Sequence, residues 1–289
     1  MKWDIPLNKD FYGLIGYPIE HSLSPIIHNY AFKLENIRAK YILIQIEDGF
    51  LKRALSKLRR EEGLRGLNVT MPHKTDIIPF LDKLDPSSKL SNSVNTIKFS
   101  NISVGYDTDG IGFLESLKYN SIDVKDKKVV LLGAGGAARS IAAQLAIHGA
   151  HITIANRTTK NAQIVAAMYK EMFKTDIATI KLEKNALKKP VAESDIIINT
   201  TALGMKQRET IITSDMLNSS TFVIDIIYNP LKTALMIEAE NANCKTMNGV
   251  SMLVHQAAKS FQIWTDKKPN IEKLMQKVES HLKATTSQQ

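Results

Sequence analysis

The feature that most constrains the fold is a glycine-rich turn between an apolar strand pattern and an apolar helix pattern. Lys128–Leu132 is a short run of β-branched and aliphatic residues that leads into the turn Gly133–Ala137. Ala138–His148 then places apolar residues at helical spacing, and His151–Ala155 is a second short apolar run. This succession of strand, turn, helix and strand predicts a right-handed parallel unit.

The same alternation continues toward the C-terminus. Ala162–Phe173 is predicted to be helical, and Asp195–Thr200 and Thr221–Ile227 are short apolar runs of buried-strand length. Runs that are apolar on both faces are typical of a parallel sheet covered by helices. We therefore expect residues 110–248 to form a doubly wound, parallel-sheet domain of the Rossmann type.

A separate α/β unit precedes this domain, and two helical segments follow it. The predicted strands of the first unit are Tyr12–Gly16, Tyr41–Gln45, Gly66–Thr70 and Val94–Phe99. Its predicted helices are Pro25–Leu34 and Phe50–Leu58. The C-terminal helical patterns are Ser251–Phe261 and Ile271–His281. The fold class predicted for the whole chain is α/β.

Composition excludes several classes of protein. Of the 289 residues, 44% are apolar and 23% are charged, which is close to the globular average and argues against wholesale disorder. Cys244 is the only cysteine, so an internal disulfide and a cysteine-rich metal site are excluded. Met1–Pro6 lacks the apolar stretch of a signal peptide, and no apolar run approaches the roughly 20 residues that span a bilayer. We expect a soluble, cytoplasmic protein that needs no metal and has no membrane partner.

The basic charge balance raises the question of nucleic-acid binding. The net charge is +9, but the lysines are spread along the chain. Arg59, Arg60 and Arg65 form only a loose cluster, which Glu61 and Glu62 interrupt. A positive field would equally steer a phosphorylated cofactor and an anionic substrate. No nucleic-acid recognition motif is present, so we expect no nucleic-acid partner.

The glycine turn fits the dinucleotide-binding fingerprint. Its first glycine permits a tight turn, its second lets the backbone approach a pyrophosphate, and a small third residue allows helix and strand to pack closely. Any tight strand-to-helix turn can use glycine, but the surrounding strand, helix and second strand favour a cofactor site. The candidate cofactor contacts in the turn are Gly133, Ala134, Gly135, Gly136 and Ala137.

The residues after the second strand indicate which dinucleotide binds. An NAD enzyme usually has Asp or Glu at this position to bind the ribose 2′-hydroxyl, and this chain has no acid there. A guanidinium can bind a 2′-phosphate bidentately and stack on adenine. A merely basic helix start is the alternative. The sequence predicts NADP, with candidate contacts at Asn156, Arg157, Thr158 and Lys160.

Two hydroxyls lie beside a predicted helix start in the first unit. Ser24 is expected to be the N-cap and Pro25 the first helical residue. Ser22 is not explained by capping, and paired hydroxyls at a helix N-terminus can bind a carboxylate. His21 and His28 lack metal-ligand partners at suitable spacing, so we interpret them as structural residues.

A second group of polar residues follows. Asn68 and Thr70 alternate on one face of a predicted strand, and Lys74 comes shortly after it. Asn95 lies near the start of another strand, and Asp109 lies in a turn-rich segment. Taken singly, each can be an ordinary loop residue. Their significance depends on whether they converge.

The chain resembles the shikimate dehydrogenase family over essentially its whole length. Several motifs occur in the family's order, which is far more specific than a glycine loop alone. The matching segments are Gly16–Asn29, Gly66–Lys74, Ser93–Ile97, Gly105–Gly112, Gly133–Ala137, Asn156–Thr158, Tyr228–Pro230 with Thr233, and Gly249–Gln256.

The resemblance implies a reversible, NADP-linked reduction of 3-dehydroshikimate to shikimate in the pathway to chorismate and the aromatic amino acids. It implies that Lys74 and Asp109 act at the reacting oxygen. The implied carboxylate-binding residues are Ser22, Ser24 and Tyr228. The residues implied to bind ring hydroxyls are Asn68, Thr70, Asn95, Asp109 and Gln256. Ile226 and Gly249 would lie against the nicotinamide.

The resemblance also has consequences for domain organisation. Because Gln256 follows the central domain, we expect the chain to return, so that residues 249–289 complete the substrate-binding domain of residues 1–109. The site is then expected between this domain and the Rossmann domain, in a monomer or a homodimer.

Two positions depart from the family pattern. Asn92 stands where the family commonly has Gly, a mild change because asparagine tolerates left-handed backbone conformations. Asp107 stands where the family commonly has Asn. It adds a carboxylate two residues from Asp109, which would shift the pH optimum if the two side chains are close.

Two alternative functions stay open. One is a quinate/shikimate dehydrogenase that uses NAD or NADP. Quinate has one more ring hydroxyl, so the pocket near Ser22, Thr70 and Tyr228 would decide. The other is a cofactor-sensing regulator that has lost catalysis, against which the presence of both Lys74 and Asp109 argues.

Overall fold

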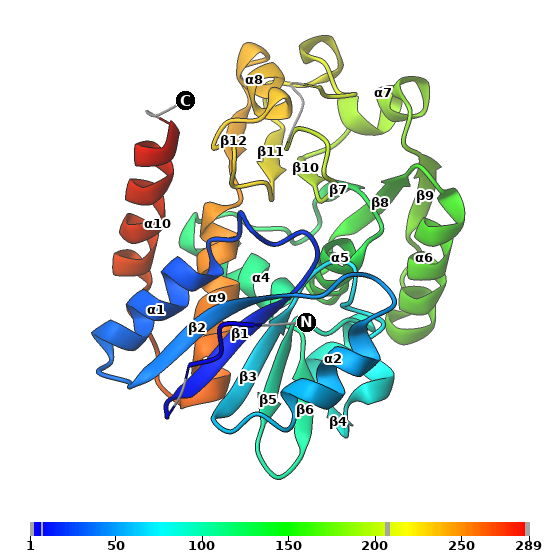
Figure 1. Cartoon of the computed structure of the whole chain (residues 1–289). Helices are drawn as coiled ribbons and strands as arrows, with labels where there is room; N and C mark the ends of the chain where they lie inside the picture. The colour runs from blue at the N-terminus through cyan, green and yellow to red at the C-terminus, as the bar shows by residue number, and fades with distance from the viewer. Residues whose placement is uncertain (1–2, 7, 206–208, 287–289) are drawn as a thin grey trace. The chain divides into compact units, whose positions relative to one another are not determined.

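The computed structural model describes residues 3–6, 8–205 and 209–286. The chain forms two compact units (Figure 1). Unit 1 comprises Met1–Gly112 and Val254–Gln289, and unit 2 comprises Phe113–Leu253. Each unit contains a six-stranded sheet with helices packed on it, so the predicted α/β class is confirmed. The chain passes between the units within helices α4 (Asp109–Tyr119) and α9 (Val250–Thr265).

The sheet of unit 1 is mixed, with the strand order β2-β1-β3-β5-β6-β4. The pairs β1–β2, β1–β3 and β4–β6 are parallel, whereas β3–β5 and β5–β6 are antiparallel. The strands are β1 (Asp10–Gly16), β2 (Ala39–Gln45), β3 (Leu64–Val69), β4 (Lys83–Leu84), β5 (Thr96–Phe99) and β6 (Ser103–Tyr106). The helices that begin and end in unit 1 are α1 (Ser24–Leu34), α2 (Leu51–Leu58), α3 (Pro86–Ser91), α10 (Ile271–Thr286) and the 3-10 turn Ile78–Phe80.

Strand alternation gives the sheet of unit 1 two different faces. One face carries Phe11, Ile15, Ile44 and Leu67, which form an apolar core with the buried side of α2. The opposite face carries aromatic and polar residues and is covered by α1 and α9. There Tyr12 packs against Phe32 of α1 at a centroid distance of 5.0 Å. It also packs against Trp264 of α9 at 4.8 Å.

The return of α9 to this sheet depends on a residue without a side chain. The indole Nε1 of Trp264 donates a hydrogen bond to the backbone oxygen of Ile97 at 3.0 Å. A Cβ at Gly66 would lie only 2.3 Å from that same Nε1 atom. Gly66 therefore makes room for the indole, which fixes the C-terminal segment on the face that carries the polar residues.

The sheet of unit 2 is wholly parallel, with the strand order β12-β11-β10-β7-β8-β9. Numbered within the unit, this is the 3-2-1-4-5-6 order of doubly wound dinucleotide-binding domains. The strand order reverses between β7 and β10, where such domains bind their ligands. The strands are β7 (Lys128–Leu132), β8 (His151–Asn156), β9 (Ala178–Lys181), β10 (Ile196–Asn199), β11 (Phe222–Asp225) and β12 (Lys245–Met247).

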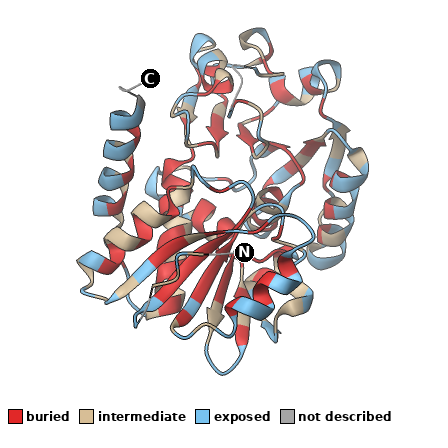
Figure 2. Ribbon diagram, in the orientation of Figure 1, coloured by how far each residue is buried: buried red, intermediate tan, exposed pale blue. Residues whose placement is uncertain are grey.

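The remaining helices flank this sheet. They are α5 (Gly136–Ile147), α6 (Thr159–Phe173), α7 (Lys184–Ala192), α8 (Ala234–Asn241) and the 3-10 turn Ser214–Met216. In both units the strands are largely buried, and exposed residues are concentrated on the outer sides of the helices (Figure 2). Across the described ranges, no helix combines the length and apolar character that crossing a membrane requires.

The long apolar elements predicted from the sequence are all present, most of them with ends shifted by one or two residues. The strands β4, β6, β9 and β12 were not predicted. Three of these, β4, β9 and β12, lie at sheet edges, where short and partly exposed strands lack a continuous apolar run. The helices α3, α4, α7 and α8 were also missed, and α7 carries Pro190 in its interior.

His28 of α1 is fully enclosed by the aromatic face of unit 1. Its ring stacks on Tyr41 at 4.4 Å with an interplanar angle of 13°, and Trp264 lies 5.1 Å away. Burial lowers the pKa of His28 from 6.5 to about 3, against a smaller opposing effect of the Asn68 side chain. The imidazole is therefore neutral in the folded protein at ordinary pH, in agreement with the structural role expected for it.

This burial predicts an acid-sensitive fold. The unfolded chain binds a proton at His28 near pH 6.5, whereas the folded chain does so only near pH 3. Stability should thus fall as the pH drops through this window, by about 2 kcal/mol between roughly pH 7.5 and 5. His28→Phe keeps a stacking ring but cannot titrate. Over the same pH interval, the variant should therefore lose about 2 kcal/mol less stability than the wild type. Urea unfolding followed by fluorescence of Trp3 and Trp264, both in unit 1, measures the difference; equal losses in the two proteins would contradict the prediction.

Candidate functional site

Lys74 and Asp109 form a close ion pair in unit 1. Lys74 lies in the turn after β3, and its Nζ donates to Oδ2 of Asp109 at 2.5 Å. The lysine side chain is 17% exposed and the aspartate side chain 8%, so the lysine is partly exposed while the carboxylate is largely enclosed. The backbone oxygen of Lys74 accepts a hydrogen bond from Val94, which anchors the turn beside β5.

Asp109 does not lie in a turn, as the sequence suggested, but is the first residue of helix α4. Gly110 and Gly112 gave this segment the composition of a turn, although the residues after them are apolar at helical spacing. Oδ1 of Asp107 accepts the backbone N–H of Asp109 at 3.0 Å and thereby caps the helix start. A carboxylate in the first turn of a helix is stabilised by the helix dipole. The effect of Asp107 on the pH optimum stays a prediction.

Asn95 holds the second oxygen of the Asp109 carboxylate. Its Nδ2 donates to Oδ1 of Asp109 at 2.8 Å, and its Oδ1 accepts the backbone N–H of Thr108 at 2.8 Å. The Oε1 atom of Gln256, on α9, lies 3.5 Å from the same Nδ2. Four of the predicted residues thus converge: Lys74, Asn95, Asp109 and Gln256.

Asn68 joins this group through buried contacts. Its Oδ1 accepts a hydrogen bond from the hydroxyl of Tyr41 at 2.7 Å. Its Nδ2 faces the backbone oxygen of Asn95 at 3.0 Å and the hydroxyl oxygens of Thr96 and Ser260 at 3.0 and 3.1 Å. These contacts lie within the protein, so the proposed contact of Asn68 with a substrate hydroxyl stays a prediction.

The two serines lie at the start of α1, but not as expected. The N-cap is Leu23, which makes no side-chain cap bond, and Ser24 is already helical. The prediction of Ser24 as N-cap is therefore wrong, because the helix begins one residue earlier. Ser22 takes part of the capping role, since its Oγ accepts the backbone N–H of Ser24 at 3.2 Å. Its hydroxyl also donates to the Ser24 hydroxyl at 3.2 Å. Thr70 directly follows β3 and is partly exposed.

In unit 2 the glycine turn has the geometry of an anion-binding loop. Gly133 has φ +109°, and a Cβ there would lie 2.5 Å from Oγ1 of Thr200. Gly135 is the N-cap of α5, and a Cβ added to it would meet nothing within 4 Å. Gly136 and Ala137 form the first turn of α5, and Ala134 is buried. The open space at Gly135 therefore adjoins the free backbone N–H groups of a helix N-terminus.

Exposed basic residues follow β8. Nδ2 of Asn156 donates to the backbone oxygen of Thr158 at 2.9 Å, and Thr158 is the N-cap of α6. Arg157 and Lys160 are exposed, and within the described ranges neither has a carboxylate partner. An anionic ligand group could be held here by both cations.

The segment after β11 is held by a buried carboxylate that the sequence did not single out. Asp225 is fully buried and accepts hydrogen bonds from Asn199 Nδ2, Ile227 N and Thr233 Oγ1 at 3.1, 3.0 and 2.7 Å. Burial raises the pKa of Asp225, and these hydrogen bonds oppose that rise. The backbone of Ile226 also packs directly on Gly249, where a Cβ would lie 1.9 Å from the Ile226 oxygen. The backbone carrying Ile226 and Tyr228 is thus held from two sides.

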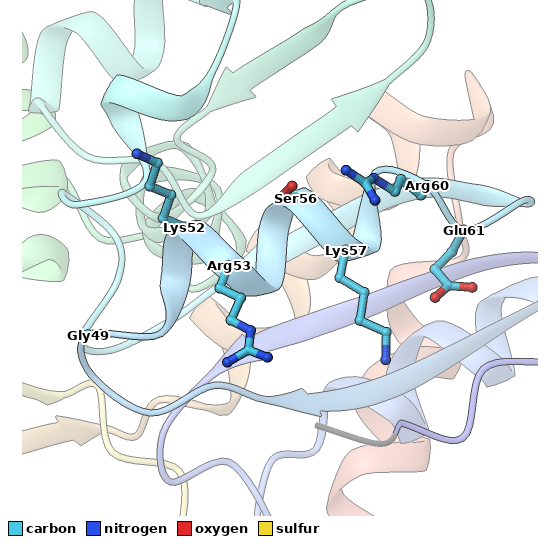
Figure 3. A pocket seen from close by; sticks show the side chains of 7 residues that line it. All are labelled: Gly49, Lys52, Arg53, Ser56, Lys57, Arg60 and Glu61. Atoms are coloured by element: carbon cyan, nitrogen blue, oxygen red, sulfur yellow. The ribbon is translucent and has the colours of Figure 1, made fainter.

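The basic residues of α2 do not form a converging site. A hollow of about 660 Å³ is lined by Gly49, Lys52, Arg53, Ser56, Lys57, Arg60 and Glu61. Figure 3 shows Lys52 and Arg60 on one side of the helix and Arg53 and Lys57 on the other. Of the arginines considered as a cluster, Arg59 is bonded to the Phe80 oxygen, and Arg65 is paired with Asp10. Among described residues, no three His, Cys, Asp or Glu side chains are grouped as metal ligands.

Comparison with known proteins identifies the family of this chain. Residues 14–97 match the shikimate dehydrogenase substrate binding domain, residues 115–235 the shikimate / quinate 5-dehydrogenase family, and residues 249–279 the shikimate 5'-dehydrogenase C-terminal domain. A shikimate dehydrogenase (NADP(+)) of Alkaliphilus oremlandii is 43% identical over 264 residues, covering 88% of this chain and 91% of the relative. The chain belongs to the shikimate dehydrogenase family.

Solved shikimate dehydrogenases share the fold. One that was crystallised with NADP+ has a TM-score of 0.88 and 38% identity, covering 96% of this chain and 97% of the other. Shikimate 5-dehydrogenase from Listeria monocytogenes, in complex with shikimate and NAD, has a TM-score of 0.85 and 36% identity over 96% of this chain and 98% of the other.

Sequence reasoning did not identify five buried polar residues that lie behind the candidate site residues or support them. They are Tyr41, Thr96, Thr108, Ser260 and, in unit 2, Asp225. Some signals were available. Ser260 lies one helical turn after Gln256 and so shares its face of α9, and Asp225 is a charged residue at the end of an apolar run. Nothing in the pattern indicated that the Tyr41 hydroxyl would reach Asn68.

Replacement by alanine should affect the stability of the protein very differently at two glycines of unit 2. Gly249→Ala forces a Cβ against the Ile226 oxygen, so we expect a loss of about 1–3 kcal/mol in the free energy of unfolding. Gly135→Ala, with φ −79° and open space at the Cβ position, should leave the ligand-free stability unchanged. Thermal unfolding followed by circular dichroism compares the two. A stable Gly249→Ala protein would show that the Ile226 segment shifts freely.

Proposed function

We propose that this protein is an NADP-dependent shikimate dehydrogenase that reversibly reduces 3-dehydroshikimate to shikimate, in the pathway to chorismate and the aromatic amino acids. The single observation that carries the proposal is the pair formed by Lys74 Nζ and Asp109 Oδ2 at 2.5 Å, with a partly exposed lysine side chain and a largely enclosed carboxylate. Family membership and the names of the relatives support it.

We assign the cofactor to residues of unit 2, and the substrate to residues of unit 1 and to Tyr228, which belongs to unit 2. Ser22 and Ser24, with Tyr228, bind the substrate carboxylate. The residues that bind ring hydroxyls are Asn68, Thr70, Asn95, Asp109 and Gln256. The domain limits that we propose are residues 1–109 with 249–289 for the substrate domain and residues 110–248 for the cofactor domain. The protein acts in the cytoplasm as a monomer or a homodimer.

The residues of unit 2 fit NADP. The open space at Gly135 leaves room for the pyrophosphate over the N-terminus of α5. The exposed Arg157 and Lys160, with Asn156 and Thr158, suit the 2′-phosphate. Ile226 and Gly249 are the proposed nicotinamide contacts. When bound, NADPH supplies the hydride that reduces the ketone.

The residues of unit 1 supply orientation and the proton. As negative charge develops on the ketone oxygen, the Lys74 ammonium stabilises it and then donates a proton from Nζ. Asp109 keeps the ammonium in place, and Asn95 keeps Asp109 in place. The partial exposure of Lys74 allows solvent to restore its proton. In the oxidative direction, the neutral amine accepts the proton of the shikimate hydroxyl.

A spectrophotometric assay tests the proposed function. Shikimate and quinate are each crossed with NADP+ and NAD+, and reduced cofactor is followed by absorbance. We expect the fastest turnover with shikimate and NADP+. Preference for quinate would support the quinate/shikimate alternative, and absence of turnover with every pair would support a regulator.

Arg157→Ala tests the cofactor assignment in a binding assay. Removing the guanidinium should weaken binding of NADP(H) much more than binding of NAD(H), because only the former has a 2′-phosphate. Binding of both reduced cofactors is measured by fluorescence titration. Equal losses for the two would contradict the assigned role of Arg157.

Lys74→Ala tests the proton donor. Turnover should fall by about 10²–10⁴-fold while KM for shikimate changes far less. Lys74→Arg keeps a positive charge but should also lose turnover, since an arginine guanidinium does not release its proton at ordinary pH. Steady-state kinetics of both variants are compared with those of the wild type. Undiminished turnover in Lys74→Ala would exclude Lys74 as the acid.

A further inference from the structure

Three buried hydroxyl groups lie behind the Lys74–Asp109 pair, and we call them the hydroxyl cluster. Thr96 opens β5, Thr108 precedes α4, and Ser260 lies on α9. The Oγ1 of Thr96 and the Oγ of Ser260 are 2.7 Å apart, and Thr108 Oγ1 is 3.1 Å from Ser260 Oγ. All three residues have no exposed surface, so none of them can contact a substrate.

The hydroxyl cluster contacts both amide side chains of the site. The Thr96 and Thr108 hydroxyls lie 2.9 and 3.0 Å from Oδ1 of Asn95, with geometry suitable for donation. On its other side the cluster contacts Asn68, whose Nδ2 lies 3.0 Å from Thr96 Oγ1 and 3.1 Å from Ser260 Oγ. Thr96 touches both amides and is therefore the centre of the cluster.

The backbone N–H of Thr108 fixes which end of the Asn95 amide faces Asp109, and the Thr96 and Thr108 hydroxyls add further contacts to that amide. The backbone N–H of Thr108 can only donate, so the atom that it meets at 2.8 Å must be the amide oxygen of Asn95. The Asn95 nitrogen then points at Oδ1 of Asp109. A reversed amide would bring its oxygen against the carboxylate and its nitrogen against the Thr108 N–H, and both contacts would be repulsive.

We propose that the hydroxyl cluster is a positioning device for catalysis, acting through Asn95 on Asp109 and through Asp109 on Lys74. Thr96, Thr108 and Ser260 are positioning residues, and Thr96 is the one with the greatest effect. The inference rests on the proposed function, because it concerns the group that transfers the proton. It adds that α9 contributes to the reaction through Ser260 as well as through Gln256.

Substitutions that change the hydroxyl but not the shape test this inference. Thr96→Val replaces the hydroxyl by a methyl group of similar size, and Thr96→Ser retains the hydroxyl and loses only the methyl. Ser260→Ala removes a second member. Thr221→Val is the matched control, since Thr221 is similarly buried, lies in unit 2, and its hydroxyl donates to the Ser194 backbone oxygen at 2.9 Å.

The first readout is kinetic. Thr96→Val should lower kcat for shikimate oxidation by about tenfold or more, because small displacements of a catalytic group are costly. KM should change much less, and the pH dependence of kcat should shift. Ser260→Ala should act in the same direction but less strongly. Thr96→Ser and Thr221→Val should stay near the wild type in both respects.

The second readout does not depend on activity. Acetylation of lysines by acetic anhydride, quantified by mass spectrometry, reports how firmly the ammonium of Lys74 is held. We expect faster labelling of Lys74 in Thr96→Val than in the wild type, relative to Lys118, a surface lysine paired with Glu115. Thr96→Ser should label as the wild type does.

The outcomes separate this inference from the proposed function. A wild-type protein without shikimate-dependent turnover overturns the proposed function, and labelling of Lys74 then still decides whether the cluster holds the pair. If Thr96→Val loses thermal stability but keeps its kcat, its pH profile and its Lys74 labelling rate, the cluster only supports packing, and the inference is overturned.

Discussion

A buried polar group without a hydrogen-bond partner destabilises a protein, and this constraint governs the site of unit 1. The face of the sheet that meets α1 and α9 carries the amide and hydroxyl side chains of Tyr41, Asn68 and Thr96. They satisfy one another in a connected path from Tyr41 through Asn68 and Thr96 to Asn95, and from there to Asp109. The pair with Lys74 ends this path, where the network reaches the surface.

Unit 2 meets a related constraint in a different way. Its parallel strands end at one edge, where backbone groups leave the sheet and need new partners. After β11 the Asp225 carboxylate accepts the backbone N–H of Ile227, together with side-chain hydrogen bonds from Asn199 and Thr233. After β10 the Oδ1 atom of Asn199 accepts the backbone N–H of Thr201. The first residues after β10 and β11 are consequently held by contacts within the protein, which suits a preformed binding surface.

The sequence predicted the long apolar elements well, because their periodicity directly reflects burial on one or both sides. It failed at edge strands and at α4, where Gly110 and Gly112 masked a helix. In the site, the resemblance to the family, and not residue spacing, indicated the roles of Lys74, Asn95 and Asp109. The sequence could not indicate Thr96, Thr108 or Ser260, because a threonine or serine in an apolar context is as compatible with a backbone bond as with a side-chain network. Only tertiary contact between residues more than 150 positions apart distinguishes the two.

Unit 1 is built from two stretches of chain that lie far apart in the sequence, and this affects how it can fold during synthesis. Trp264 and Ser260, which cover the polar face of its sheet, are made only after the whole of unit 2 has been translated. Unit 2, by contrast, is one uninterrupted stretch and has all its strands as soon as residue 253 leaves the ribosome. During synthesis the nascent chain thus carries an uncovered aromatic and amide surface near its beginning. Helix α9, which is made later, closes that surface and completes the proposed proton-transfer site.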